Sequence, residues 1–351
     1  MLGALLLLPS FHAPPRLAFG PHNPSGALAS ARSSPPTAQL ADGDTICVIG
    51  ASGNVGKLVA LRLAERYRVR GVVRSAASVR DFLPASVELF ETDVVRGESS
   101  GLEQALAGVN GVVVCTGTTA FPTKAWAKSP EEGGLIPALI RALASSQARW
   151  NTEAALRLLD EEGYNTPANV DTSGTLKVLD AWARAAGDAR KQFVLMSSIG
   201  VQRRDQMPFP ILNACGVLDA KAAAEAALQQ AAAKDGFCYT IVRPGQLFGG
   251  PYTNNFYLGT LFQLDKDAAS QDRLRAPEDS PFDFWMCCYS KTDVVVSRGD
   301  TLTGDTLRST LAEVIAQALE SGTVQNMDFS LINEKGTPPA VEQLRERLAA
   351  L

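Results

Sequence analysis

Short apolar runs alternate with segments of helical periodicity along most of the chain. In the runs nearly every position is apolar, which is typical of strands buried on both faces of a parallel sheet. Between them, apolar residues recur at spacings of three and four, as on one face of a helix. From residue 45 onward this alternation predicts an α/β fold, with a single doubly wound parallel sheet and helices on both of its faces. The expected strands are 45–49, 68–74, 86–90, 111–115, 192–196, 238–243, 293–296 and 328–331.

The first strand runs directly into a glycine-rich turn and a helical pattern, over the residues TICVIGASGNVG. In such a turn Gly50 permits a sharp bend, Gly53 lets the backbone approach a pyrophosphate, and Gly56 lets the helix pack close to the strand. The start of the helix adds free N–H groups and a partial positive charge. This context predicts a dinucleotide site in an NAD(P)-binding Rossmann fold, and a turn that only reverses the chain is the alternative. The expected cofactor-binding residues here are Gly50, Ser52, Gly53, Asn54, Val55 and Gly56.

The end of the second strand carries the residue that distinguishes the two nicotinamide dinucleotides. NAD-type proteins place an acidic residue near this position to bind the ribose 2′-hydroxyl. This chain instead has Arg74, followed by Ser75. A guanidinium suits a 2′-phosphate through paired, charge-assisted hydrogen bonds, so we expect NADP(H) to be favoured over NAD(H). The alternative is a solvated arginine at a strand end.

Two later strand ends carry short polar segments that complete the expected cofactor site. Asp93 and Val94 follow the third strand, where the carboxylate is expected to accept a hydrogen bond from the adenine amino group. Small residues at Thr116, Gly117 and Thr118 follow the fourth strand and would let the loop pass close to the cofactor. The alternatives are a capping aspartate and an ordinary polar turn.

The alternation is interrupted between residues 128 and 165. Segments 135–148 and 153–159 both have helical spacing, which predicts an inserted helical pair after the fourth strand. We expect the insertion to belong to a single NAD(P)-binding domain over 42–351, with a C-terminal substrate-side region at 246–351. Three roles for the insertion remain open: a lid, an interface or a decoration of the fold.

Residues 1–41 have the composition of a targeting leader, because they contain arginines but no aspartate or glutamate. Residues 1–8 look like a short signal-type apolar core, and the following SFHAP is similar to the bipartite leaders of algae with complex plastids. We therefore expect a plastid signal and transit peptide. A disordered tail or another organelle is the alternative. No apolar run reaches the roughly 18 residues of a membrane span, so we expect no transmembrane segment.

Charge and rare residue types exclude several function classes. The formal net charge is −4 and no basic block stands out, so we expect no nucleic-acid partner. The only histidines are His12 and His22, both in the leader, which excludes Ser-His or Cys-His catalysis and histidine zinc sites in the domain. The six cysteines show no Cys-x-x-Cys spacing, so we predict reduced thiols in a reducing compartment and no metal site.

Seven segments together resemble the atypical short-chain dehydrogenase/reductase superfamily, in its NmrA-like NAD(P)-binding branch of plant and algal plastids. They cover about residues 44 to 330, apart from the insertion, and their combination implies the fold and the cofactor but not the reaction. The segments are VIGASGNVG, VVRS, ETDV, VDTSGTLKVLDA, FVLMSSIGV, LDAKAAAEAAL and YTIVRPG.

The resemblance also implies candidate catalytic residues, with one departure. In reductases of this superfamily a tyrosine four residues before a lysine donates the proton, and a serine after the fifth strand orients the carbonyl. Lys221 matches the lysine and Ser197 or Ser198 matches the serine, with Ser198 as the catalytic candidate. The tyrosine position, however, holds Val217, which cannot donate a proton. Tyr252 or Tyr257 could supply an acid from elsewhere, although an aromatic residue in a loop more often packs.

The resemblance assigns further residues to the nicotinamide end of the cofactor. Lys221 would hold the ribose with Glu225 as its partner one turn later, or the two would form an ion pair on a helix surface. The expected cofactor-binding residues of this end are Ser197, Lys221, Pro244 and Gly245.

Two functions from different classes remain open. The first is an NADPH-dependent oxidoreductase acting on an unknown small organic substrate, favoured by Lys221, Ser198 and the Pro-Gly loop. The second is a non-catalytic NADP(H)-binding redox sensor or assembly scaffold with a plastid protein partner, favoured by Val217.

Overall fold

The computed structural model describes residues 39–129, 135–249 and 292–351. Most of the expected leader and the aromatic stretch at 252–290 lie outside these described residues. The same is true of His12, His22, Tyr252, Tyr257, Cys287 and Cys288.

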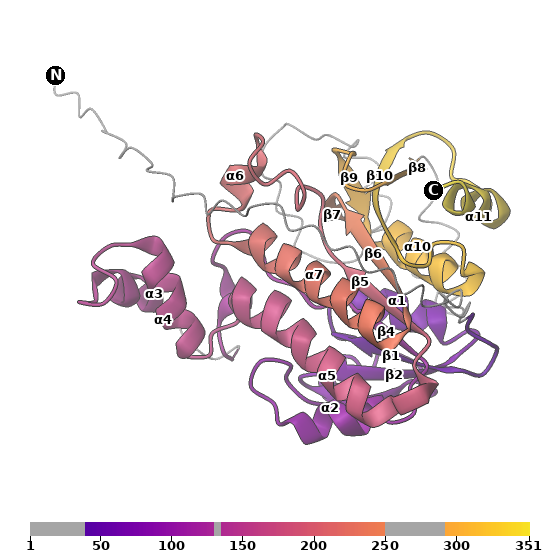
Figure 1. Cartoon of the computed structure of the whole chain (residues 1–351), viewed down its shortest axis with the longest axis horizontal. Coiled ribbons are helices and arrows are strands. Elements are labelled where there is room, and N and C mark those ends of the chain that lie inside the picture. Colours follow the sequence, from indigo (N-terminus) through magenta and orange to yellow (C-terminus); the bar gives the residue numbers. More distant parts are fainter. Residues whose placement is uncertain (1–38, 130–134, 250–291) are drawn as a thin grey trace, which may run out of the picture. The chain divides into compact units, whose positions relative to one another are not determined.

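Eight strands form one sheet, in the order β3-β2-β1-β4-β5-β6-β10-β8 (Figure 1). Strand β1 pairs with β2 on one side and with β4 on the other. The connections after β1 and β4 therefore leave in opposite directions, and this switch point is where α/β sheets bind ligands, beyond the carboxyl ends of the strands. The strands are β1 (Thr45–Ile49), β2 (Arg68–Val73), β3 (Glu88–Glu91), β4 (Gly111–Val114), β5 (Gln192–Met196), β6 (Cys238–Pro244), β8 (Thr292–Arg298) and β10 (Met327–Lys335).

The edge strand β8 corrects the expectation of a wholly parallel sheet. Seven neighbouring strands, from β3 to β10, are parallel, but β8 runs antiparallel to β10. Apolar patterning reports which faces are buried and carries no information on strand direction. A second small sheet, β7 (Gln246–Phe248) with β9 (Asp305–Leu307), was not predicted, because three-residue strands are too short to show a period.

The two faces of the sheet carry separate apolar cores. Ile46 and Val48 of β1 pack on one face, whereas Cys47 and Ile49 pack on the other, as alternation along a buried strand requires. The first core holds residues of α1, α10 and α11, and the second holds residues of α2, α5 and α7. These helices are α1 (Gly56–Leu63), α2 (Ser99–Leu106), α5 (Gly174–Ala186), α7 (Val217–Asp235), α10 (Arg308–Ser321) and α11 (Val341–Ala349).

The expected helical pair lies between β4 and α5, as α3 (Leu135–Ala144) and α4 (Thr152–Glu161). The first of these helices ends at Ala144, earlier than the predicted 148. The pair packs on its own small core, in which Trp126 and Leu159 are fully buried. A further short helix, α6 (Phe209–Leu212), follows β5.

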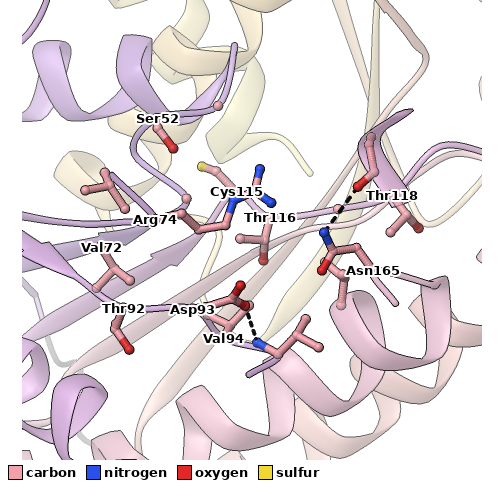
Figure 2. Close-up of a pocket in the computed structure, with 17 residues that line it drawn as sticks. Ser52, Val72, Arg74, Thr92, Asp93, Val94, Cys115, Thr116, Thr118 and Asn165 are labelled. Atoms are coloured by element: carbon pink, nitrogen blue, oxygen red, sulfur yellow. Dashed lines mark hydrogen bonds between the residues drawn. The ribbon is translucent and has the colours of Figure 1, made fainter. Parts of the chain in front are cut away.

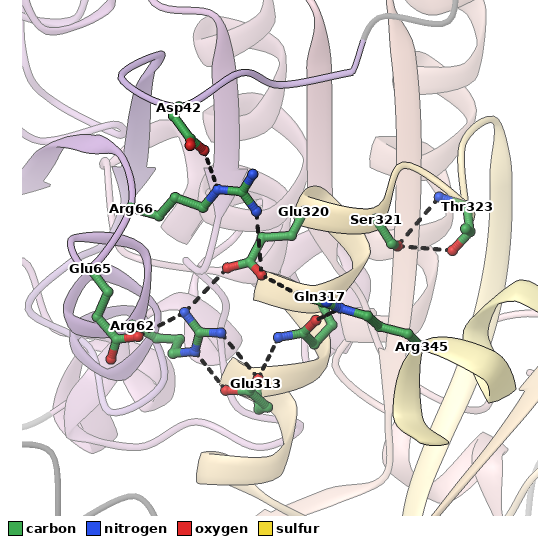
Figure 3. Close-up of polar contacts among 10 residues, drawn as sticks. All are labelled: Asp42, Arg62, Glu65, Arg66, Glu313, Gln317, Glu320, Ser321, Thr323 and Arg345. Atoms are coloured by element: carbon green, nitrogen blue, oxygen red, sulfur yellow. Dashed lines mark hydrogen bonds and ion pairs between the residues drawn. The ribbon is translucent and has the colours of Figure 1, made fainter. Parts of the chain in front are cut away.

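Helices α1, α10 and α11 are joined by a network of charged side chains (Figure 3). Arg62 of α1 forms ion pairs with Glu65 at 2.9 Å, Glu313 at 2.8 Å and Glu320 at 3.2 Å. Arg345 of α11 reaches the same Glu320 carboxylate at 3.1 Å. Burial raises the pKa of Glu65, the Arg62 charge lowers it, and the Glu313 and Glu320 charges raise it again. Arg62 thus holds three carboxylates together where α1, α10 and α11 meet.

We expect Arg62→Met to destabilise the protein by about 2 kcal/mol at pH 8, between the costs of breaking exposed and buried ion pairs. Without the guanidinium, burial and the Glu313 and Glu320 charges raise the pKa of Glu65 in the folded state further above its unfolded value. The folded state then binds more protons, so its stability rises as the pH falls. The deficit in free energy of unfolding, relative to the unaltered protein, should therefore be largest at pH 8 and smaller at pH 5, as measured by urea unfolding. Arg184→Met, which breaks an exposed pair with Glu103, is the control, and a deficit that stays constant or grows on acidification would contradict the interpretation.

Candidate functional site

The glycine turn after β1 brings the start of α1 against the end of the strand. Gly50 has φ +82°, in the left-handed region that favours glycine. A Cβ atom on Gly56 would lie 2.1 Å from the carbonyl oxygen of Gly50, so no other residue fits there. No side chain caps the start of α1, but the Lys57 N–H donates to the Gly53 carbonyl oxygen at 3.1 Å, so the remaining N–H groups of the first turn are the ones available to a bound anion.

A cavity of about 190 Å³ lies beside this turn, at the carboxyl ends of β1, β2 and β4 (Figure 2). Nine of the predicted cofactor-binding residues line it: Gly50, Ser52, Gly53, Arg74, Asp93, Val94, Thr116, Gly117 and Thr118. Asn54, Val55 and Gly56 are not among its lining residues. Its wall also includes residues that the sequence did not indicate: Val72, Val73, Thr92, Val95, Cys115, Ala125, Asn165 and Val170.

Arg74 extends into this cavity from the end of β2 (Figure 2). Its side chain is exposed and makes no hydrogen bond or ion pair with the residues that the structure describes. A guanidinium carries five N–H donors and a permanent charge, so an unpaired one beside a cavity favours an anionic ligand group.

Asp93 has the capping role that the sequence left as an alternative, and it also lines the cavity. Its Oδ1 accepts hydrogen bonds from the backbone N–H groups of Val95 at 2.8 Å and Arg96 at 3.3 Å. Its Oδ2 pairs with the Arg96 guanidinium at 2.6 Å. The role of the Asp93 carboxylate in binding adenine stays a prediction.

Arg96 joins the cavity to the base of the insertion. This role of Arg96 was not predicted from the sequence. Besides Asp93, its guanidinium donates to the carbonyl oxygens of Gly163 and Lys128, both at 2.9 Å, and to the Asn165 side chain at 3.0 Å. Asn165 lines the cavity and donates in turn to the carbonyl oxygen of Ala127 at 2.6 Å. The insertion therefore supplies part of the cavity wall. The spacing of Asp93 and Arg96 was visible in the sequence, but the partners across the insertion were not.

A second, inner cavity of about 10 Å³ has room for about one water molecule. It is lined by Thr116, Asp171, Thr175, Leu195, Met196, Ser197, Lys221 and Ala224. Thr116 also lines the larger cavity, and a Cβ atom on Gly117 would lie 3.2 Å from the Lys221 Nζ. The Lys221 ammonium is therefore close to the loop that separates the two cavities.

The partner of Lys221 is Asp171, which corrects the expectation that it would be Glu225. The Lys221 Nζ donates to the Asp171 Oδ1 at 2.7 Å, and both side chains are buried. The other Asp171 oxygen accepts from the Thr118 hydroxyl at 2.6 Å and from its N–H at 3.2 Å. Asp171 lies in a π-helical turn, Ala168–Ser173, just before α5. One helix's sequence cannot reveal a partner that a neighbouring helix contributes.

Glu225 belongs to a different buried network that holds Ser197. Its Oε1 accepts from the Ser197 hydroxyl at 2.5 Å, and its Oε2 pairs with Arg243 at 2.6 Å. Arg243 also pairs with Asp328 of β10. Burial lowers the pKa of Arg243, but hydrogen bonds and charges from Glu225 and Asp328 outweigh it and raise the pKa above its usual value. Lys221 and Glu225 therefore do not form the surface ion pair that was the other alternative.

Three further predicted positions are explained by packing. Val217 is buried in an apolar cluster with Ile199, Val201, Phe209 and Leu218. A Cβ atom on Gly245 would lie 2.1 Å from the Gly304 carbonyl oxygen, so close packing requires this glycine. The Ser198 hydroxyl donates to the Ile199 carbonyl oxygen at 3.0 Å. Ser198, Pro244 and Gly245 line neither of the two cavities.

The comparison with family models decides the family. A model described as NAD(P)H-binding matches residues 50–271, which is more than half of the chain. The chain belongs to this NAD(P)H-binding family. The match includes the glycine turn, Arg74 and both cavities.

A curated protein is related to this NAD(P)H-binding chain by sequence. An uncharacterised chloroplastic protein of Arabidopsis thaliana is 29% identical over 206 residues, which are 58% of this chain and 53% of that protein. The chain thus spans about half the length of this curated relative.

Two solved structures are similar over most of their length. The oxidoreductase ylbE from Lactococcus lactis gives a TM-score of 0.51 at 16% identity, over 88% of this chain and 96% of that one. A candidate NAD-dependent epimerase/dehydratase from Bacillus halodurans gives a TM-score of 0.50 at 19% identity. The match covers 87% of this chain and 100% of that one. At these identities the likeness shows the Rossmann-type fold alone.

The cavities of this NAD(P)H-binding chain offer charge and hydrogen bonds, but no reactive thiolate. Burial raises the pKa of the Cys115 thiol, in the wall of the larger cavity, to about 12, so this thiol stays neutral. The described cysteines, Cys47, Cys115, Cys215 and Cys238, form no disulfide. Among the described residues no three His, Cys, Asp or Glu side chains are grouped as a metal site would need. None of the helices in the described ranges has the length and apolar character needed to cross a membrane.

We expect Arg96→Met to loosen the base of the insertion, because the charged donor to Asp93, Asn165 and two carbonyl oxygens is lost. Amide hydrogen exchange at residues 124–128 and 163–166 should become faster, and dinucleotide affinity should fall about three- to tenfold. Arg157→Met, which breaks an exposed pair with Glu153 in α4, is the matched control. Unchanged exchange at the base would show that Arg96 does not hold the insertion.

Proposed function

We propose that this chain binds NADP(H) in preference to NAD(H) and acts as an NADPH-dependent oxidoreductase on a small organic substrate. One observation carries the cofactor preference: Arg74 lines the larger cavity with an exposed and unpaired guanidinium. The 2′-phosphate is the group by which NADP(H) differs from NAD(H), and an arginine near this position accommodates it in Rossmann folds.

We assign the adenosine half of a dinucleotide to the larger cavity and the nicotinamide ribose to the Lys221 ammonium, which lies next to Gly117 in the wall of that cavity. The inner cavity itself is too small to hold either half. The pyrophosphate would bind the N–H groups at the start of α1. Within the described part of the chain the Lys221 Nζ donates to Asp171 alone, which leaves two of its three N–H donors for ribose hydroxyls. The site requires an acceptor there, because a buried ammonium is costly when its protons are unpaired.

A bound NADPH would supply a hydride to the substrate. We place the accompanying proton on a protein group other than residue 217, because the valine there has no proton to donate. The hydroxyl protons of Ser197 and Ser198 already go to Glu225 and to a carbonyl oxygen. Lys221 is the charged proton donor among the inner-cavity residues, and an ammonium and a phenol are acids of similar strength. We therefore assign the proton to the Lys221 Nζ, with Asp171 holding the ammonium in place, and give Ser198 no proton-donating role.

A non-catalytic NADP(H) sensor or scaffold is the second candidate function. The burial of Val217 in an apolar cluster favours it, because apolar packing fills the position where related reductases hold their proton donor. A sensor must bind NADPH and NADP⁺ with clearly different affinities, since a ligand shifts states only by differential binding. Oxidation of NADPH by any member of a panel of carbonyl and enone metabolites would instead favour the enzyme.

A plastid location is part of the proposal, together with membership of the NmrA-like branch. The chloroplastic relative supports both, as does the leader-like composition of residues 1–41. A fluorescent fusion of the full chain that stays outside the plastid would contradict this part without affecting the cofactor site.

Arg74→Ala should weaken NADPH binding about 10- to 100-fold in calorimetry, because paired hydrogen bonds to the 2′-phosphate are lost. NADH binding should stay within a factor of two. Arg74→Lys keeps the charge without the planar fork and should give an intermediate loss. The control is Arg68→Ala at the other end of β2, where the side chain donates to the Gly43 carbonyl oxygen. Equal losses for NADPH and NADH would refute the 2′-phosphate assignment.

Lys221→Met should weaken NADPH binding about tenfold or more, because the charged donor to the ribose is lost. Binding of 2′,5′-ADP, which lacks the nicotinamide half, should be unchanged. Because Lys221→Met alone leaves the Asp171 carboxylate buried and unpaired, the double variant with Asp171→Asn keeps the result interpretable if the single variant unfolds. Lys234→Met, at the exposed far end of α7, is the control. Equal weakening of both ligands would mean that Lys221 serves the fold only.

A further inference from the structure

The carboxylate of Glu91 lies on the strand next to Arg74 and has no role in the functions described above. Glu91 is the last residue of β3 and is exposed. In the register of the sheet it pairs with Val73, the residue that precedes Arg74. The next residue on its own strand, Thr92, lines the larger cavity. Glu91 and Arg74 thus leave neighbouring strands at the same edge of the site.

The Glu91 side chain is anchored to the segment that follows Arg74. Its Oε1 accepts a hydrogen bond from the backbone N–H of Ala76 at 2.5 Å, at the start of the short 3-10 turn Ala76–Ser78. Arg74 extends into the cavity instead (Figure 2), and the two side chains form no ion pair. Among the residues that the structure describes, no cation pairs with the Glu91 carboxylate, so its negative charge is held beside the site without being neutralised. Asp93 differs, because Arg96 pairs with its carboxylate.

The geometry points to Glu91 as a residue that opposes the 2′-phosphate and so limits the preference for NADP(H). This inference rests on the proposed function, because it concerns the ligand group assigned to Arg74. Ala76 is two residues after Arg74, a span of at most about 7.6 Å between Cα atoms. A phosphate on Arg74 would then lie on the order of one screening length from the Glu91 carboxylate.

Glu91 acts against the phosphate in two separable ways. Its charge repels a dianionic group, which at this separation in water of low ionic strength amounts to about a three- to fivefold loss of affinity, and to less than about twofold at physiological salt. Its Oε1 also occupies the Ala76 N–H, which would otherwise be a further donor for an anion. NADH carries no 2′-phosphate, so neither effect applies to it.

The test is calorimetry on the full chain with NADPH and NADH, and with the fragments 2′,5′-ADP and 5′-AMP. Glu91→Gln removes the charge but keeps an oxygen that can accept from Ala76. It should raise the NADPH-to-NADH affinity ratio about three- to fivefold at low ionic strength, through tighter NADPH binding, and less so at high salt. Glu91→Ala also releases the N–H and should raise the ratio about tenfold. Glu88→Gln, at the other end of β3 in an ion pair with Arg70, should leave the ratio unchanged.

The failure of this inference differs from the failure of the proposed function. If the unaltered chain binds NADPH and Arg74→Ala weakens that binding, but both Glu91 variants keep the original ratio, Glu91 does not oppose the phosphate. A ratio that rises because NADH binding is lost would also overturn the inference, because Glu91 would then bind the ribose. If the unaltered chain binds neither dinucleotide, both proposals fall together.

Discussion

The contact between Gly56 and the carbonyl oxygen of Gly50 is the constraint on which the site depends. With no room for a Cβ atom, α1 begins directly behind the turn and its N–H groups point toward the carboxyl edge of the sheet. The same turn is held from the other side, because a Cβ atom on Gly50 would lie 2.8 Å from the Thr116 side chain. The segments after β1 and β4 therefore pack against each other, and the larger cavity opens beside them.

The charges of the molecule divide into two groups with different physical roles. The buried charges of Lys221, Asp171, Glu225 and Arg243 are all paired, which offsets part of the cost of burying them and joins α7 to β6 and to the turn before α5. Arg74 is exposed and has no hydrogen-bond or ion-pair partner among the described residues, so its guanidinium is available to a ligand group. The paired charges hold the geometry of the site, and the exposed charge lies in the wall of its larger cavity.

Much of the fold could be predicted because the signals were local. Apolar runs indicated all eight strands of the main sheet, and the strand-turn-helix context indicated the position of the larger cavity. Arg74 was identified from its place at a strand end. The direction of β8, the Asp171 partner of Lys221 and the reach of Arg96 to Asn165 were not predictable, because each depends on contacts between segments far apart in the sequence. The Lys221–Glu225 pairing was wrong for the same reason: helical spacing places two residues on one face but does not reveal the neighbours that compete for them.

The position of Arg96 also makes the insertion part of a thermodynamic linkage. Ala125 and Asn165, on either side of α3 and α4, contribute to one cavity wall with residues from the carboxyl ends of β1 and β2. A ligand that binds only when this wall is assembled stabilises the assembled state by mass action. Binding of a ligand in the cavity then also stabilises the folded form of α3 and α4, a helical pair that lies outside the sheet. The occupancy of the cavity and the local stability of the insertion would rise and fall together.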